Sequence, residues 1–322
     1  MQQACPSERR GAIPSLPPAT DAGPGPLPAD PASAPLAVVT VAHHSQAVLP
    51  RLAHDLARQS RPPARWLLVD NSPDSAPLST AGLALKPELL QGQEGDGFGC
   101  GCNRALEALA QSGWRGWVWL LNPDTGLPVG KELEQLLQRL RPLPATALVG
   151  TAVREGNGFE ASGGWIDAGL RFRRRRLEAA HLAAKGPVAV DWLSGCSLLL
   201  QPEAHHPPAR FDPRFPLYYE DMDLCLRLAA TGAPVLWLPR PEVQHRRGSG
   251  SAAASPRRLQ LSTLSYLRFL RIHTAGWVFA LRSLRLLLLS LLRLPLHPRN
   301  SLVALGSLVR VLGERNHTPM LP

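Results

Sequence analysis

The chain has 322 residues, of which 44% are hydrophobic and 19% are charged. These fractions are ordinary for a globular protein, and they exclude wholesale disorder and a multi-span membrane protein. The formal net charge is +10, and almost all of the basic residues are arginine. Such a balance indicates anionic partners without choosing among nucleic acid, acidic lipid and phosphorylated substrates.

The cysteines and the most apolar segment indicate the cellular compartment of the protein. The five cysteines lack zinc-site spacing, and their odd number is typical of reduced thiols in a cytoplasmic enzyme. The start of the chain has no apolar core of a secretory signal. The most apolar stretch, residues 277–296, is interrupted by Arg282, Arg285 and Arg293. We therefore predict a cytoplasmic protein without a membrane-spanning helix.

The first half of the chain alternates strands with helices. Residues 1–36 contain nine prolines and predict a disordered leader. Short apolar runs at 36–42, 66–70, 117–121 and 147–150 predict buried strands. Helical spacing predicts helices at 48–59, 103–110 and 131–140, with a glycine-rich loop at 95–101. This alternation predicts an α/β fold with a mostly parallel twisted sheet and helices on both faces.

The second half has a different pattern. Residues 188–193, 197–200 and 234–238 predict strands, and residues 223–231 predict a helix. The run 171–176 holds five arginines, which indicates either a solvated face or a contact with an anionic glycan or a lipid diphosphate. A linker at 248–255 separates the predicted domain at 37–250 from a C-terminal basic helical region at 251–322.

The C-terminal region begins with Ser255-Pro256, a favourable N-cap and first helical residue. If one continuous helix follows, five arginines fall within an arc of about 100° opposite a leucine-rich face. Such a helix is typical of one that lies on an anionic membrane surface. The alternative is a helix that packs on the domain and leaves its arginines in water, and we favour the membrane surface.

Acidic residues occur where an open α/β sheet binds its ligands, beyond the carboxyl ends of its strands. Asp70 follows one predicted strand and Asp124 follows another. A carboxylate at Asp124 suits Mg²⁺ or Mn²⁺, which prefer oxygen ligands, although Asn-Pro-Asp is also typical of a simple turn. Glu220 and Asp221 follow two tyrosines that would shield them from water, a setting in which a carboxylate becomes a useful general base. Acids at the start of a helix also serve as caps and stabilise the helix dipole.

Short motifs occur in a fixed order along the chain. They are Val41 in the first strand, Asp70-Asn71-Ser72, Gly97-Phe98-Gly99-Cys100-Gly101-Cys102-Asn103, Leu121-Asn122-Pro123-Asp124, Gly195, Glu220-Asp221-Met222-Asp223-Leu224-Cys225-Leu226-Arg227 and Val243-Gln244-His245. This ordered set resembles family 2 glycosyltransferases, and among them most of all the rhamnosyltransferase-like branch, over residues 37–270. The resemblance implies a GT-A fold and the use of a nucleotide diphosphate sugar.

The resemblance also implies roles for individual residues. Asp124 and His245 would hold a divalent cation, Mg²⁺ or Mn²⁺, at the donor diphosphate. Asp221 would be the general base, with Glu220 positioning the acceptor or the base. The residues implied in nucleotide-sugar binding are Thr40, Asp70, Asn71, Gly97, Phe98, Asn103, Asn122, Trp192 and Gly195.

A sugar transfer of this kind requires a metal-binding acid and a basic carboxylate, whichever family the chain belongs to. Displacement of a diphosphate from an anomeric carbon develops negative charge that a divalent ion neutralises. The attacking hydroxyl needs a carboxylate to accept its proton on the opposite face of the sugar. One acid on the metal and a distant acid as base therefore suffice for a single displacement, which inverts the anomeric configuration.

The sequence departs from the family pattern at two places. Gly95 stands where an asparagine usually begins the Asn-x-Gly-Phe motif, and His43-His44 replaces a usual Tyr-Asn pair. Neither departure removes the expected metal ligands or base. We interpret His43 and His44 as polar loop residues.

These observations predict an inverting hexosyl- or rhamnosyltransferase in cell-envelope polysaccharide synthesis, with a glycan or lipid-linked acceptor. It would be cytoplasmic with a possible peripheral contact to an anionic membrane, and no nucleic-acid reader motif is present. One alternative is a catalytically inactive scaffold, which Gly95 alone favours. A nucleotidyltransferase is the other, but it needs a basic, glycine-rich phosphate loop after the first strand, and residues 42–45 supply none.

Overall fold

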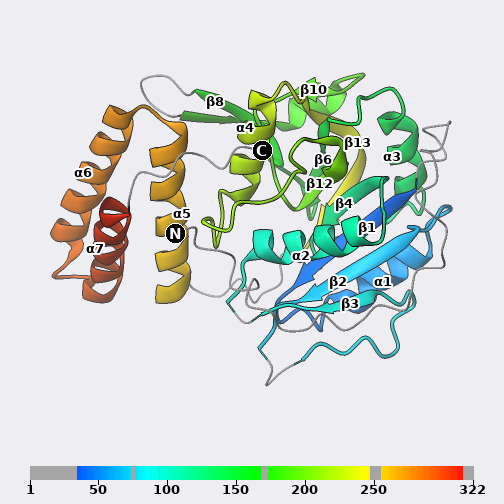
Figure 1. Cartoon of the computed structure of the whole chain (residues 1–322), viewed down its shortest axis with the longest axis horizontal. Helices are drawn as coiled ribbons and strands as arrows, with labels where there is room; N and C mark the ends of the chain where they lie inside the picture. The colour runs from blue at the N-terminus through cyan, green and yellow to red at the C-terminus, as the bar shows by residue number, and fades with distance from the viewer. Residues whose placement is uncertain (1–34, 74–76, 94, 168–172, 247–254, 315–322) are drawn as a thin grey trace.

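The computed structural model describes residues 35–73, 77–93, 95–167, 173–246 and 255–314. The predicted leader at 1–36 lies almost wholly outside these residues, as does most of the predicted linker at 248–255. A large sheet forms the centre of the molecule (Figure 1). Its strands are β1 (Leu36–Ala42), β2 (Arg65–Asp70), β3 (Glu88–Gln91), β4 (Trp117–Leu121), β5 (Thr125–Gly126), β6 (Leu148–Glu155), β7 (Gly158–Glu160), β10 (Val188–Ala189), β12 (Ser197–Leu200) and β13 (Val235–His245).

The sheet is mostly parallel, as predicted. Its strand order is β10-β13-β6-β12-β4-β1-β2-β3, with β5 paired to β13 and β7 paired to β6. Strands β1 to β4 run parallel to one another, and β6 runs parallel to β13. Strand β12 lies between β4 and β6 and is antiparallel to both. The loop before β12 therefore reaches the sheet edge at which β4 ends.

Helices cover both faces of the sheet. One face packs against α2 (Phe98–Gln111) and α4 (Glu220–Ala230). The other face packs against α1 (Leu49–Ala57) and α3 (Glu132–Leu140). Alternate residues of β1 divide between these two cores, which is why the strand is apolar on both faces.

A smaller sheet lies beside α4. It consists of β8 (Gly163–Asp167), β9 (Arg173–Arg176) and β11 (Trp192–Leu193), paired in the order β11-β8-β9. Short 3₁₀ turns at Ala179–Ala183 (η3) and Pro202–Ala204 (η4) complete the central part. The basic run at 171–176, predicted as an exposed element, thus contributes a strand.

Three helices form the C-terminal region: α5 (Pro256–His273), α6 (Gly276–Arg293) and α7 (Pro298–Gly313). They stand together to one side of the sheet (Figure 1), and α5 contacts α4. Ser255 caps α5 by accepting a hydrogen bond from the backbone N–H of Arg258, as its sequence predicts. Within the described chain, no helix combines the length and the apolarity needed to cross a bilayer.

Two local predictions were wrong. The glycine-rich segment at 95–101 is not all loop, because α2 already begins at Phe98. The C-terminal helix is not continuous, because Thr274 and Ala275 are extended and separate α5 from α6.

Candidate active site

Strand pairing brings Asp124 and His245 together. Asp124 follows β4 and directly precedes β5, and Thr125 of β5 pairs with His245 at the end of β13. The backbone N–H of Arg246 donates to the carbonyl of Asp124 at 2.9 Å, which closes this junction. As a result, Nε2 of His245 lies 3.3 Å from Oδ1 of Asp124. The two residues predicted as metal ligands are 121 positions apart in the sequence (245 minus 124) and are neighbours in the fold.

His245 has a second carboxylate neighbour that the sequence did not reveal. Its Nδ1 lies 2.7 Å from Oε2 of Glu160, the last residue of β7. Burial of the imidazole disfavours its charged form, but its close contacts with the carboxylates of Asp124 and Glu160 outweigh this and raise the His245 pKa to about 9. Glu160 orients the ring so that Nε2 faces Asp124.

The residues present fit a divalent cation. Oδ1 of Asp124 is buried and, among the described residues, has no hydrogen-bond partner. An unpartnered carboxylate oxygen facing an imidazole nitrogen is a suitable donor pair for Mn²⁺ or Mg²⁺. Clusters of three or more potential protein ligands are absent from the described part of the chain.

A second acidic site lies at the start of α4. Tyr218 and Tyr219 have φ angles of 64° and 68°, a left-handed conformation that is uncommon for aromatic residues. This turn precedes Glu220, the first residue of the helix. One carboxylate oxygen of Asp221 accepts a hydrogen bond from the backbone N–H of Gly195 at 3.0 Å, and the other accepts one from the N–H of Met222 at 2.8 Å.

The two adjacent acids have different surroundings. Burial raises the pKa of Asp221, and the backbone hydrogen bonds from Gly195 and Met222 oppose this rise. Burial and the nearby charge of Asp221 raise the Glu220 pKa to about 8. Glu220 is only 7% exposed, and its Oε2 is buried without a partner among the described residues. Its charge also raises the pKa of the Cys102 thiol, so the Glu220 side chain faces α2 in the interior.

The metal pair and the α4 acids meet at the same sheet edge. Gly195, which bonds Asp221, directly precedes Cys196, whose carbonyl accepts a hydrogen bond from the N–H of Asn122 at 3.1 Å. Asn122 lies two residues before Asp124. The β4–β12 ladder continues from this point, with Leu121 opposite Ser197. Asp124 and Asp221 therefore flank the Ser194–Cys196 loop.

No model of a protein family matches the chain. A curated relative from Mycobacterium tuberculosis (strain H37Rv), an N-acetylglucosaminyl-diphospho-decaprenol L-rhamnosyltransferase, is 27% identical over 273 residues, covering 75% of this chain and 86% of the relative. The same protein from strain CDC 1551 matches equally.

Two solved structures have similar folds. The mannosyltransferase PcManGT from Pyrobaculum calidifontis, in complex with GDP-Man and Mn²⁺, has a TM-score of 0.53 at 15% identity and covers 89% of this chain and 78% of its own. GalNAc-T7 with UDP, GalNAc and Mn²⁺ has a TM-score of 0.52 at 16% identity, with coverage of 72% of this chain. The match spans 47%, about half, of the GalNAc-T7 chain.

The chain is a glycosyltransferase with the GT-A fold. Its sequence is similar to that of a rhamnosyltransferase, and the predicted fold class is confirmed.

Glycines let α2 of this glycosyltransferase approach the site closely. A Cβ atom at Gly195 would lie 2.7 Å from Cε1 of Phe98, so the Asp221-binding loop and the start of α2 are in direct contact. Phe98 also packs edge-to-face against Phe211. Gly97 lies so close to the carbonyl of Pro216 that no side chain fits between them. The predicted residues Gly97, Phe98 and Gly195 thus form one wall.

Asn103 of α2 stabilises this arrangement of Gly97, Phe98 and Gly195. Its Nδ2 donates to the carbonyl of Phe211 and its Oδ1 accepts from the N–H of Phe211, both at 2.8 Å. Both polar groups of the amide are therefore engaged with the backbone. Asn103 holds the segment before α4 against α2, a structural task for a residue predicted to bind the donor.

The residues after β2 organise a loop. Both carboxylate oxygens of Asp70 accept backbone N–H bonds, from Ser72 at 2.9 Å and Leu78 at 2.8 Å, and the side chain is 1% exposed. Nδ2 of Asn71 donates to the carbonyl of Asp96 at 3.2 Å. Oδ1 of Asn71 is buried with no partner among the described residues, which leaves one acceptor facing the loop before α2.

Thr40 and Trp192 differ in their relation to the site. Thr40 is completely buried, and its hydroxyl accepts a hydrogen bond from Nε1 of Trp66 at 3.1 Å. Trp192 is buried on β11, and its indole N–H has no partner within the described chain. Thr40 is thus a core residue, whereas Trp192 lies three residues before Gly195 and retains a free donor.

Both departures from the family pattern fall at left-handed backbone positions. Gly95 has a φ of 95° and His44 has a φ of 52°. Glycine, asparagine and, less often, histidine tolerate this region. Glycine at position 95 and histidine at position 44, where the family usually has asparagine, therefore keep the local backbone.

Proposed function

We propose that this glycosyltransferase transfers a hexosyl unit, foremost rhamnosyl, from a nucleoside diphosphate sugar to a lipid-linked glycan with inversion. The observation that carries the proposal is the separation of two acids across the Ser194–Cys196 loop. Asp124 faces His245 on one side, and Asp221 is held by the N–H of Gly195 on the other. An inverting displacement needs one acid at the leaving group and another at the nucleophile.

The metal site would be formed by Asp124 and His245. A divalent ion bound there would neutralise negative charge on the departing diphosphate. Because the described chain lacks a cluster of three protein ligands, donor phosphate oxygens and water would complete the coordination, as is usual for Mg²⁺. The Mn²⁺ in both solved relatives supports a divalent cation.

Asp221 would accept the proton of the acceptor hydroxyl. Two backbone N–H groups hold its carboxylate in one orientation, and its raised pKa makes it a stronger base than an exposed aspartate. Glu220 lies behind it in the interior, so we assign Glu220 a positioning role through its neighbour.

The donor nucleotide would lie between the loop after β2 and the start of α2. Asn71 offers an unpartnered oxygen there, while Asp70 fixes the loop that carries it. Asn122, Phe98 and Gly195 would border the diphosphate and the sugar. The indole N–H of Trp192 would donate to the sugar or to the acceptor.

The printed name of the curated relative supports the substrate classes. That protein is a rhamnosyltransferase acting on a diphospho-decaprenol-linked sugar. We infer a similar acceptor here, and therefore a cytoplasmic enzyme working at the membrane surface in cell-envelope polysaccharide synthesis.

A two-stage experiment tests the function. Thermal-shift measurements with Mn²⁺ and a panel of nucleotide sugars should show stabilisation by one donor, because ligands that bind the native state raise its stability. That donor is then incubated with N-acetylglucosaminyl-diphospho-lipid, and the anomeric configuration of the product is determined by NMR. A product with retained configuration, or no transfer and no hydrolysis with any donor, would contradict the proposal.

A further inference from the structure

The C-terminal helices carry most of the apolar side chains that the protein exposes. Among the described residues, ten of the thirteen exposed large hydrophobic side chains lie between positions 277 and 312, on α6, on α7 and in the turn between them. Figure 1 shows α6 at the edge of the molecule, with α5 between it and the central sheet. Single exposed leucines are ordinary, but a concentration of this kind marks an interaction surface.

On α6 the exposed apolar side chains occupy one face. Counted at 100° per residue, they fall within an arc of about 100°. They are Trp277, Leu281, Leu284, Leu288, Leu291 and Leu292, and we call them the leucine face. The turn after α6 adds Leu296, and α7 adds Leu302, Val309 and Leu312.

The side chains that α6 and α7 bury are small or polar to an unusual extent. Helix α6 packs against α7, and four of the eight residues that the two helices bury are serines: Ser283, Ser290, Ser301 and Ser307. A helix in water normally buries its leucines and exposes its polar side chains. Helix α6 instead buries two serines while six large apolar side chains stay exposed. Small residues between helices and leucines outside them are typical of helices in contact with lipid.

The charge of these helices is of one sign. Residues 256–313 contain nine arginines and neither aspartate nor glutamate. Arg285, Arg293 and Arg299 are exposed. Arg285 borders the leucine face, because it lies four residues after Leu281 and three before Leu288. Arginines beside exposed leucines suit an anionic lipid surface, whose headgroups attract the guanidinium groups while its acyl chains take up the apolar side chains.

The same charge disfavours a second copy of the protein as the partner. In a symmetric dimer the leucine face would meet itself. The arginines of both copies would then approach one another, and residues 256–313 offer no carboxylate to separate them. Like charges brought together at an interface are costly, whereas an anionic bilayer neutralises them.

We infer that the leucine face of α6, with the exposed apolar residues of the following turn and of α7, inserts into the surface of an anionic bilayer. Both helices would lie along that surface, with their apolar side chains among the acyl chains and Arg285, Arg293 and Arg299 among the headgroups. The inference rests on the proposed function for its purpose, since it names the surface that brings the enzyme to a lipid-linked acceptor. The docking itself needs no substrate.

Sedimentation with vesicles tests the docking without donor, metal or acceptor. The wild type should bind vesicles made of equal parts dioleoylphosphatidylglycerol and dioleoylphosphatidylcholine, and should bind pure dioleoylphosphatidylcholine more weakly. Leu284→Gln with Leu288→Gln should weaken binding about tenfold or more, because two leucines no longer leave water. Glutamine keeps the helix propensity of leucine, and both positions are exposed, so the unfolding curve should stay that of the wild type.

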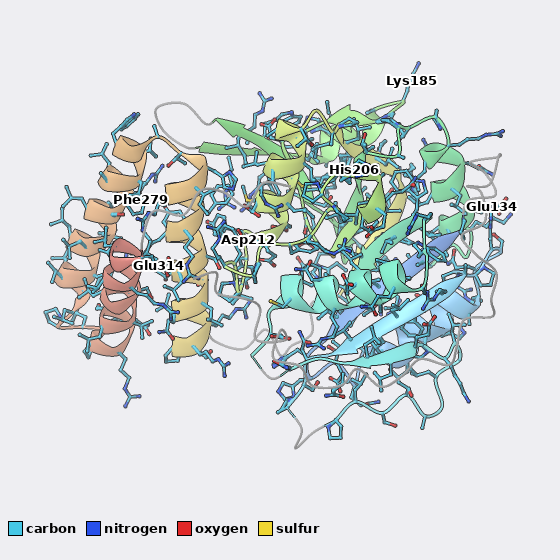
Figure 2. All side chains as sticks on the ribbon, viewed as in Figure 1. Glu134, Lys185, His206, Asp212, Phe279 and Glu314 are labelled. Carbon is cyan, nitrogen blue, oxygen red and sulfur yellow. The ribbon has the colours of Figure 1, made fainter. Side chains whose placement is uncertain are left out.

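Leu89→Gln with Val129→Gln is the matched control, since it replaces two exposed apolar residues elsewhere. Leu89 lies on β3, and Val129 lies three residues before α3 begins. Figure 2 labels Glu134 on α3 and Phe279 on α6, at opposite ends of the molecule. The control should bind vesicles as the wild type does. Absence of binding by the wild type, undiminished binding by the α6 variant, or equal loss in the control would each overturn the inference.

Tryptophan fluorescence separates insertion from a contact of the arginines alone. Trp277 belongs to the leucine face, whereas the other seven tryptophans lie between positions 66 and 237. Vesicles with brominated acyl chains should quench the fluorescence of the wild type, and Trp277→Phe should lose most of that quenching. Vesicle binding without quenching would mean a contact with headgroups only and would overturn the insertion. Quenching that survives in Trp277→Phe would show that another surface faces the lipid.

The oligomeric state and the transfer reaction complete the test. If the α6 double variant converts a dimer to a monomer and still binds vesicles, a second copy covers the leucine face and the lipid assignment is wrong. The variant should transfer sugar at the wild-type rate to a short soluble acceptor, citronellyl-diphospho-N-acetylglucosamine, and more slowly to a long-chain acceptor in vesicles. Vesicle binding that the variant loses supports the docking even if no sugar is transferred, so failure of the proposed function is recognised separately.

Discussion

Asp221 and Glu220 are adjacent in the sequence, and their surroundings stabilise the charged carboxylate to different extents. Backbone N–H groups of Gly195 and Met222 stabilise the charged form of Asp221. Glu220 is buried with an unpartnered oxygen, and its pKa is raised to about 8. Two neighbouring carboxylates do not both ionise at low cost. The backbone N–H groups therefore favour a negative charge on Asp221 over one on Glu220.

The raised pKa of Glu220 predicts a pH dependence of stability. Its value is 4.5 in the unfolded chain and about 8 in the folded protein. Between these values the native state holds a proton that the unfolded state has released, so stability falls as pH rises through this window. Glu220→Gln should remove about 5 kcal/mol of that fall. Urea unfolding across the window measures it, with the exposed Glu107→Gln as control. Parallel curves for wild type and Glu220→Gln would contradict the assignment.

At the scale of elements, helix α2 determines the shape of the site. Its first turn approaches Gly195 through Phe98 and the segment before α4 through Gly97. Asn103 then fixes that segment with two hydrogen bonds to Phe211. The helix, the Ser194–Cys196 loop and the start of α4 therefore hold one another in place.

Removing the Asn103 amide tests this arrangement. Asn103→Ala leaves the N–H and carbonyl of Phe211 without their partners, which should cost about 1–3 kcal/mol of unfolding free energy. Because Phe98 and Phe211 pack together, donor affinity should weaken as well. The exposed Gln111→Ala on the same helix should change neither quantity. Normal stability together with normal donor affinity in Asn103→Ala would show that the clamp is dispensable.

The elements differ in how well the sequence predicts them. Strands β1 and β4 match their predicted bounds because they are buried on both faces and bounded by turn residues. The predicted start of α2 was too late, because glycines have low helix propensity. The contacts with Phe211 and Pro216 that require glycine at positions 99 and 97 are visible only in the structure. Glu160 was not singled out, because its partner His245 is distant in the sequence. Thr40 was expected at the site, although its alternation with Val39 and Val41 directs it to the opposite core.

At the scale of the whole molecule, α5 attaches the C-terminal helices to the catalytic part. Nε2 of His273 lies 2.8 Å from Oδ1 of Asp223 on α4. Arg268 donates to the carbonyl of Arg214 at 2.6 Å and pairs with Glu314 after α7. These contacts cross from one part to the other, so α5 is held against α4 and the segment before it.

Arg268→Ala should loosen this attachment. It leaves a carbonyl and a carboxylate without their shared partner, which should cost about 2 kcal/mol. Hydrogen exchange should accelerate in α5 and α7 and stay unchanged in the central sheet. Arg310→Ala is a matched control, because Arg310 also lies near Glu314 but at 3.9 Å and half exposed. Faster exchange throughout the sheet would mean that the helices do not open as a separate unit.

The central claim is that Asp124 serves the donor metal and Asp221 serves the acceptor proton. Its most direct test compares Asp124→Asn and Asp221→Asn in one set of measurements: sugar transfer, and donor binding with and without Mn²⁺. Asp221→Asn should lower kcat by about 10²–10⁴-fold with unchanged donor affinity. Asp124→Asn should abolish the Mn²⁺-dependent part of donor binding. Transfer at the wild-type rate by Asp221→Asn, or Mn²⁺-dependent donor binding that survives Asp124→Asn, would contradict the account.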